Sequence, residues 1–518
     1  MKRYAAQSLV LALGLTPLAN PHAHAAITES GDIVVTDDDI TYGDTAFATL
    51  LVNSGSVFSP VSPADPADPF SVFLGRSAGG TGLATIRDAG SVFNVDDNLN
   101  IGLSGGTGRL TVFNGATVNV ARQTIINSID ATDSGITVAS PGSVYNGGDR
   151  DFIVFQGRVL VQNEGRINAL NPDNGVVKVR IGEIPGSTAQ LIVQSGGIFD
   201  ATASPAEPGN NSSTRDGDVF IGNGGGPSGG QAIVTVQSGG QFLADQVLIR
   251  SPKDTPASIT VTGPGTQFTA LRRIEASVGA SNMLVTDGAA VQTVNYELGG
   301  TGTGTHTLTV SDGAAVLATG NIQVGRLGGT GVLSVSSPGT TVQANSQFSI
   351  AWPGPNSTGT VDIGAGTTLT ANGQGFRLAQ QSNSVANIIF RIGDVGGGVF
   401  DSGTVIATDL RFGQGTSTFD LLLDPGVTLE LGDKFVLIDY GNDGNGIDDE
   451  DLRFDIEDNG FAGIADGGII TRGGYDFLID YDDDLGGGDL AFTATVVPEP
   501  TSLALLALGG MLVARRRA

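Results

Sequence analysis

The sequence predicts an all-β protein: a right-handed parallel β-helix of about 12 coils, with a β-rich C-terminal cap and a short C-terminal transmembrane helix. Three observations predict this fold. The composition is rich in glycine and poor in charge. One short apolar pattern recurs with a period of about 25 residues, and the same turn residues follow its copies.

The composition also excludes several classes of protein. The 518 residues include 79 glycines without a G-X-Y period, so the chain is not collagen-like. Only 15% of residues are charged, and the net charge of -27 argues against a basic face for nucleic acid or anionic lipid. The chain has no cysteine, which excludes disulfides and a cysteine nucleophile.

The first 25 residues have the pattern of a secretory signal peptide. Lys2 and Arg3 precede a short apolar stretch, which is followed by Ala23-His24-Ala25. A basic start, an apolar core and small residues at the end are the features of such signals. We expect cleavage after Ala25, with Ala23 and Ala25 as the small residues of the site.

The body is built from a repeated β unit, shown clearly by Leu110-Thr111-Val112 followed by the turn Asn114-Gly115. The copies align on their third residue. These residues are Val52, Ile86, Val112, Val138, Val161, Val193, Val236, Val261, Val285, Val310, Val335 and Ile363. Weaker echoes follow at Ile392 and Leu423. We expect the third residues to point inward and to stack from coil to coil.

Two corners recur in each unit. The first carries pairs such as Asn114-Gly115 and Asp312-Gly313, which supply positive φ angles. The second carries Gly-Gly-Thr-Gly sequences, as at residues 79–82 and 328–331. The latter resemble phosphate-binding loops only superficially, because no Lys-Ser/Thr pair follows and the sequence recurs along the chain.

A unit of this size cannot bury its own apolar face, so neighbouring units must stack into a solenoid. A propeller is the alternative, but its blades need about 40 residues. We expect the repeat domain to cover residues 26–374, and an acidic β-rich cap and spacer to cover 375–495. Three polar insertions, at residues 59–69, 170–175 and 201–217, occupy one position of the repeat and should emerge on one side.

The last segment, residues 496–518, joins a Pro-Glu-Pro motif to a short apolar run and a basic tip. Its marked residues are Pro498, Glu499, Pro500, Arg515, Arg516 and Arg517. The run has about 14 residues, short of the roughly 20 that span a bilayer, and the arginines should stay cytoplasmic. The segment resembles the PEP-CTERM sorting signal of Gram-negative bacteria; a simple tail anchor is the alternative.

This resemblance implies that an exosortase, a membrane-embedded processing enzyme, binds the tag in the inner membrane and releases the body toward the surface or matrix. The units between about residues 45 and 370 resemble repeats shared by autotransporter passengers and PEP-CTERM proteins, which are associated with β-helical surface stalks. The autotransporter route itself does not fit, because the chain ends in arginines and leaves no room for a membrane barrel.

Candidate chemical sites are sparse. Asp443, Asn445, Asp448 and Asp449 lie in an acidic stretch, but Ile447 breaks the spacing of a calcium loop, so a solvated loop is favoured over a calcium site. We expect no cofactor.

Four further residues stand out, and each has an ordinary structural explanation. Asp287 and Asp312 precede turn glycines, where aspartate is expected for backbone reasons and a cation or sugar site is the alternative. His306 has no obvious partner and is expected at the surface. Trp352 is expected to cover a coil edge, with sugar stacking as the alternative.

These features favour an exported structural or adhesive protein of the cell surface, extracellular matrix or biofilm, without enzymatic activity. Its expected partners are exosortase, the inner membrane transiently, and an extracellular polysaccharide; nucleic acid is not expected. A carbohydrate- or calcium-binding module is the alternative, and a polysaccharide-active β-helix enzyme is less favoured, because only the fold class suggests it.

Overall fold

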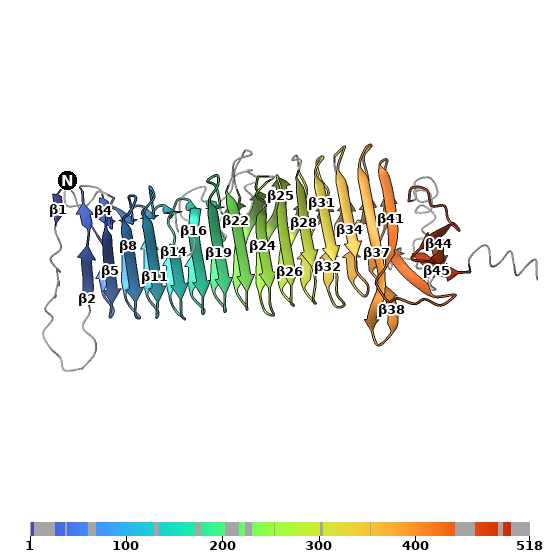
Figure 1. Ribbon diagram of the computed structural model, residues 1–518, viewed down its shortest axis with the longest axis horizontal. Coiled ribbons are helices and arrows are strands. Elements are labelled where there is room, and N and C mark those ends of the chain that lie inside the picture. The colour runs from blue at the N-terminus through green and yellow to red at the C-terminus, as the bar shows by residue number, and fades with distance from the viewer. Residues whose placement is uncertain are drawn as a thin grey trace, which may run out of the picture. The chain divides into compact units, whose positions relative to one another are not determined.

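The computed structural model describes residues 2–4, 26–36, 39–60, 69–128, 134–170, 178–202, 217–222, 230–252, 254–300, 304–352, 354–440, 461–484 and 490–498. Within these ranges every regular element is a β-strand (Figure 1), so none of them contains a helix long and apolar enough to cross a membrane. The expected C-terminal helix lies outside them. The chain divides into two compact units, Met1–Val294 and Asn295–Ala518.

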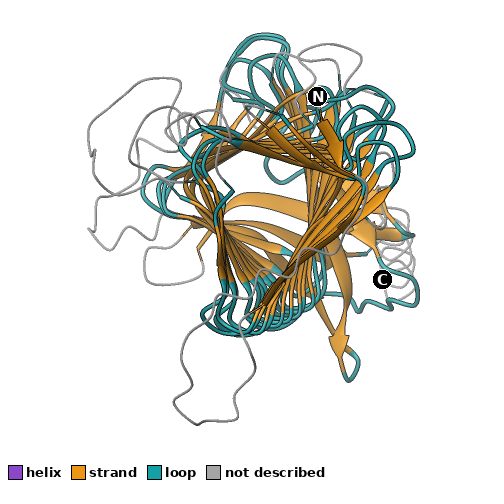
Figure 2. Cartoon of the chain, turned by 90° about the vertical axis from the view of Figure 1, so that its left-hand side faces the viewer, coloured by secondary structure: helices purple, strands orange, loops and turns teal. Residues whose placement is uncertain are grey.

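Each unit is a parallel β-helix whose strands form three stacks, which we call walls 1, 2 and 3 (Figure 2). In the first unit, wall 1 contains β5 (Phe47–Asn53), β8 (Thr81–Arg87), β11 (Thr107–Phe113), β14 (Gly135–Ala139), the later part of β16 (Phe152–Gln162), β19 (Thr188–Gln194), β22 (Gln231–Gln237), β24 (Ala257–Thr262) and β26 (Ser281–Thr286). Wall 2 contains β6 (Val57–Phe58), β9 (Val92–Val95), β12 (Thr117–Val120), β15 (Val144–Asn146), β17 (Arg166–Asn168), β20 (Ile198–Ala201) and the first parts of β23 (Gln241–Arg250) and β25 (Gln267–Val278). Wall 3 contains β4 (Asp39–Tyr42), β7 (Ser71–Leu74), β10 (Leu99–Ile101), β13 (Thr124–Asn127), the start of β16, β18 (Lys178–Ile181), β21 (Asp218–Ile221) and the later parts of β23 and β25.

The second unit repeats this plan, and β27 (Ala290–Leu298) contains the boundary between the units. Its wall 1 contains β28 (Thr305–Val310), β31 (Thr330–Val335), β34 (Thr358–Ile363), β37 (Val385–Gly396) and β41 (Thr416–Leu423). Wall 2 contains β29 (Ala315–Ala318), β32 (Thr341–Ala344), β35 (Thr368–Ala371), β39 (Thr404–Ala407) and β42 (Lys434–Tyr440). Wall 3 contains the end of β27, β30 (Ile322–Val324), β33 (Gln347–Ile350), β36 (Gly375–Leu378) and β40 (Leu410–Phe412).

This architecture confirms the predicted all-β solenoid and the register of its core. All twelve third-position residues, from Val52 to Ile363, are at most 1% exposed. Within each unit they lie opposite one another on successive strands of wall 1, for example Val112 opposite Val138 and Val310 opposite Val335. Side chains alternate between the two faces of a strand, so the residues between them point outward.

The two weaker copies of the repeat, aligned on Ile392 and Leu423, are out of register with the column of third-position residues, so the prediction for them is wrong. Ile363 lies opposite Phe390, and Phe390 lies opposite Leu421, so Ile392 and Leu423 fall two residues further along their strands. The physical reason is the length of β37, which continues beyond the corner where shorter strands end and forms a hairpin with β38 (Val399–Ser402). Ile392 is nevertheless buried, because two residues along a strand restore the same face.

Aromatic side chains add a second column to the interior of the first unit. Phe199, Phe242 and Phe268 occupy equivalent inward positions of wall 2, with ring centroids 5.6 and 4.4 Å apart and rings within 8° of parallel. All three are fully buried. Parallel rungs, which repeat about every 4.8 Å, place equivalent rings at stacking distance.

The corner between walls 1 and 2 has the predicted turn chemistry. Asn114 and Gly115 have φ angles of 55° and 80°, and Asp312 and Gly313 have φ angles of 55° and 71°. Consecutive positive φ angles suit Asn-Gly and Asp-Gly pairs. A buried hydroxyl of the next coil completes the corner: Gly115 donates its N–H to Ser143 Oγ at 3.0 Å.

The three predicted insertions leave the first unit at one corner. They follow β6, β17 and β20 of wall 2 and precede β7, β18 and β21 of wall 3. The flanking strands therefore place all three at the corner between walls 2 and 3, as expected. The insertions themselves lie mostly outside the described residues.

Antiparallel strands flank the coils at the two chain ends. At the N-terminal end, β2 (Ala26–Gly31) pairs with β5, while β3 (Ile33–Val35) pairs with β4 and with β1 (Lys2–Tyr4). Parallel pairing continues past residue 374 and reaches β42. There β45 (Leu490–Val497) pairs antiparallel with β42 and β44 (Tyr475–Asp484), and β43 (Ile469–Arg472) pairs with β44. We call this antiparallel sheet the cap.

Candidate functional site

The chain leaves the cap through β45, directly before the Pro-Glu-Pro motif. Val496 is 3% exposed and donates its N–H to the carbonyl of Asp433 at 2.8 Å. The carbonyl of Val496 accepts the N–H of Gly432 at 2.9 Å, and Val497 lies opposite Asp476 of β44. Folded structure therefore extends to the residue before Pro498.

Most residues singled out from the sequence lie outside the described part of the chain. They are Ala23, Ala25, Asp443, Asn445, Asp448, Asp449, Glu499, Pro500, Arg515, Arg516 and Arg517. The signal cleavage site, most of the tag and the calcium alternative therefore stay predictions. Among the residues that the structure describes, no group of three or more His, Asp or Glu side chains is placed to hold a metal ion.

His306 is buried, so the expectation that it lies at the surface is wrong. It is 1% exposed, because strand alternation in β28 turns Thr305 and Thr307 outward and His306 inward. It lies opposite Gly331, and the next residues in the same column are Gly359 and Ala386. Burial lowers the pKa of His306 to about 4, which keeps the imidazole neutral at pH 7.

Asp287 and Asp312 both lie in the left-handed backbone region, with φ angles of 56° and 55°. This conformation favours Asp, Asn or Gly and agrees with the backbone explanation for both residues. Asp312 also accepts the hydroxyl of Ser337 at 2.9 Å, which connects it to the next coil.

Trp352 lies at the end of β33, in the corner between walls 3 and 1. Its backbone N–H donates to the carbonyl of Gly325 at 2.9 Å, and the guanidinium of Arg377 lies 5.6 Å from the centre of its ring. A cation over the ring face is a favourable contact that occupies one side of the indole. The indole therefore contacts a side chain of the next coil, as expected for a coil-edge residue.

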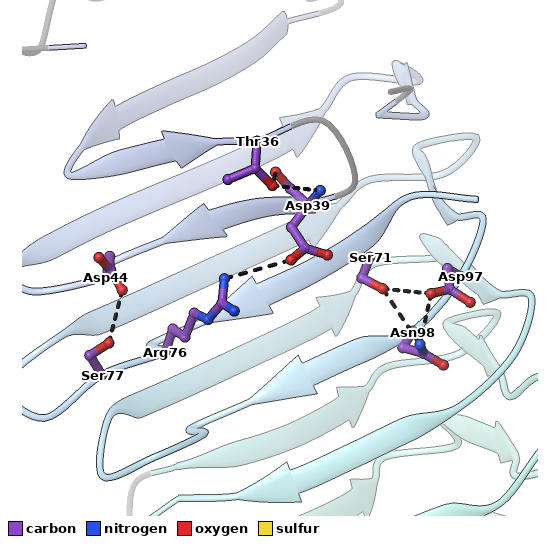
Figure 3. Close-up of polar contacts among 8 residues, drawn as sticks. All are labelled: Thr36, Asp39, Asp44, Ser71, Arg76, Ser77, Asp97 and Asn98. Carbon is purple, nitrogen blue, oxygen red and sulfur yellow. Dashed lines mark hydrogen bonds and ion pairs between the residues drawn. The ribbon is translucent and has the colours of Figure 1, made fainter. Parts of the chain in front are cut away.

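Carboxylates at the corners of the first unit connect successive coils (Figure 3). Asp97 accepts hydrogen bonds from Ser71 Oγ at 2.6 Å and from Asn98 Nδ2 at 2.7 Å. It also accepts one from Arg122 Nη1 at 2.7 Å, a contact that the figure does not draw. At the corner between walls 3 and 1, Asp44 accepts the hydroxyl of Ser77 at 2.9 Å. These acids satisfy hydrogen-bond donors of the chain itself, which is the behaviour of structural carboxylates.

Two ladders of amide side chains follow the outer faces of the walls in the first unit. On wall 2, Asn94, Asn119, Asn146 and Asn168 are connected by hydrogen bonds of 2.8, 2.8 and 2.7 Å. A shorter ladder on wall 1 joins Gln162, Gln194 and Gln237 at 2.9 and 2.7 Å. An amide has both donor and acceptor atoms, so equivalent amides one rung apart can bond in series.

The C-terminal segment is the part of the chain that a known family model recognises. Residues 496–518 match the PEP-CTERM protein-sorting motif. This motif implies an exported protein of Gram-negative bacteria, which an exosortase recognises and sorts across the membrane. The match begins at Val496, inside β45, so the motif and the cap share two residues.

The comparisons with whole proteins add little. No curated protein matches the chain. Among solved structures, the crystal structure of the Haemophilus influenzae Hap adhesin shows 10% sequence identity over 84% of this chain, with a TM-score of 0.14. The chain spans 65% of the length of that protein, and a likeness this low carries no inference.

Sequence reasoning missed the amide ladders and the position of β45. The asparagine ladder has a detectable signal, because Asn94, Asn119 and Asn146 each follow an inward residue at the same place in the repeat. The pairing of β45 with β42 has no comparable signal, since these antiparallel partners are far apart in sequence and leave no period to read.

Proposed function

We propose that this protein is a non-enzymatic structural or adhesive protein, released by an exosortase to the cell surface or extracellular matrix. It needs no cofactor. The observation that carries the proposal is the use of polar groups on the walls of the first unit, where amides and corner carboxylates bond from coil to coil. Polar side chains that hydrogen-bond to one another from coil to coil stabilise a regular scaffold.

This use of polar groups differs from what catalysis requires. A polysaccharide-active enzyme needs an acid and a base that converge on one bond, each free to exchange a proton. Asp97 instead accepts three hydrogen bonds from its own chain. A solenoid with three regular walls suits repeated, weak contacts along a polymer, and extracellular polysaccharide is the partner we propose.

The proposal is tested by localisation in matched strains with and without exosortase activity. We expect mature protein at the surface or in the matrix of the first strain, and uncut precursor in the inner membrane of the second. Identical distribution in both strains would contradict the sorting function.

Binding assays separate the remaining alternatives. Purified protein, with calcium or with a chelator, is applied to an array of acidic and neutral glycans. Calcium-dependent binding to one glycan would favour a dedicated binding module. Release of reducing sugar from acidic polysaccharides would instead establish an enzyme.

A further inference from the structure

The last strand of the cap, β45, ends directly before the sorting motif. β45 is a central strand, paired with β42 on one side and with β44 on the other. Its inward residues Phe492, Ala494 and Val496 are at most 3% exposed. The ring of Phe492 contacts those of Phe419 and Tyr481, with centroid distances of 5.1 and 4.9 Å.

Withdrawing β45 from the cap would be costly. Val496 uses its N–H and its carbonyl in hydrogen bonds to Asp433 and Gly432. Moving the strand out would expose the ring of Phe492 and open the edges of both neighbouring strands. An enzyme that binds its substrate as an extended peptide competes for the same backbone groups.

Little chain separates the cap from the membrane segment. Only residues 498–500 lie between the end of β45 at Val497 and the apolar run that begins at Thr501. Three residues span at most about 10 Å. The folded cap must therefore lie next to any enzyme that acts on the motif.

We propose that the folded cap sets the N-terminal limit of processing: the sorting enzyme cuts on the C-terminal side of Val497, and the mature protein retains all of β45. This inference rests on the proposed sorting function. In the cut, one peptide bond after Val497 breaks. Its carbonyl carbon is transferred to water, giving a carboxylate, or to an acceptor amine, giving a new amide. The proton that the attacking water or amine loses goes to the nitrogen of the departing tag.

The first test is the mass of the C-terminal peptide of mature protein from cells with exosortase activity. We expect a peptide that contains Val497. An enzyme-dependent cut at or before Val496 would overturn the inference and leave the sorting function intact. A chain that stays uncut in these cells would overturn both.

The second test measures access with the full-length precursor. Six Gly-Ser residues inserted between Val497 and Pro498 move the motif away from the cap. We expect the precursor to disappear several-fold faster in a pulse-chase experiment, and the mature protein to retain the insert. The same six residues inserted at the exposed hairpin tip after Gly397 serve as the control and should leave the rate unchanged.

If both insertions leave the precursor lifetime unchanged, the cap does not restrict access and the inference fails. Limited proteolysis of both variants checks that the cap remains folded. Acceleration by the tag insertion alone supports the inference.

Discussion

At the scale of single residues, burial in wall 1 follows strand alternation, and the sequence pattern was sufficient to predict it. Val310 lies in a column of aliphatic residues, while Thr309 beside it points outward. The same alternation buries His306, which the sequence alone placed at the surface. The prediction failed because it judged His306 by its polar neighbours rather than by its place on the strand.

The inward position of Val310 is tested by Val310→Asp. A charge buried in an aliphatic column costs several kcal/mol, so the melting temperature of the protein should fall strongly. Thr309→Asp, on the outer face of the same strand, is the matched control and should melt within a few degrees of the wild type. Equal melting temperatures for Val310→Asp and the wild type would show that this register is wrong.

His306 should make stability depend on pH. Its pKa falls from 6.5 to about 4 on folding, so the unfolded chain binds the proton first as the pH decreases. The contribution of His306 to stability is therefore present above pH 6.5 and is lost toward pH 4, a decrease of about 3 kcal/mol. Urea unfolding of a chain starting at Ala26 measures this change.

The control for that experiment is His306→Ala, since the same column contains Gly331 and Ala386. Carboxylates titrate in both proteins, so the difference between the two stability curves isolates the histidine. We expect the difference to change between pH 6.5 and 4. Curves that stay parallel over this range would show that His306 is not buried in a neutral form.

At the scale of elements, the coils were predictable and the cap was not. The repeat period and the turn residues predicted wall 1, the corners and the common position of the three insertions. The prediction from the pattern failed at β37, whose extra length adds a further buried residue, Ile392, beyond the aligned position Phe390. In the cap, β42 pairs with β45 across residues 441–489, and the alternating pattern of these strands does not say which partner each takes.

β45 should be the element that completes the cap. A chain of residues 26–497 keeps this strand, whereas a chain of residues 26–484 loses it and exposes the edges of β42 and β44. We expect the longer chain to melt like the body of the full protein. The shorter chain should lose hydrogen-exchange protection in β42 and β44 and should associate through its open edges. Equal protection in the two chains would show that β45 does not stabilise the cap.

At the scale of the whole molecule, short sequence motifs predict the role of the two ends, and the repeat period predicts the fold of the body between them. The chain combines a predicted signal peptide, β-helical units and a recognised sorting motif. The net charge of -27 keeps such a protein soluble outside the cell and opposes association through strand edges. The proposed contact with a polysaccharide depends on surface chemistry that the repeat period does not encode.

The central claim, that an exosortase sorts this protein through its C-terminal motif, is tested most directly by replacing Pro498, Glu499 and Pro500 with alanine. The measurement is the intact mass and cell fraction of the protein in an exosortase-proficient host. We predict that the wild type is found outside the inner membrane at the mass of the cut form, and that the variant stays in the inner membrane with its tag. Normal release of the variant at the mature mass would contradict the claim.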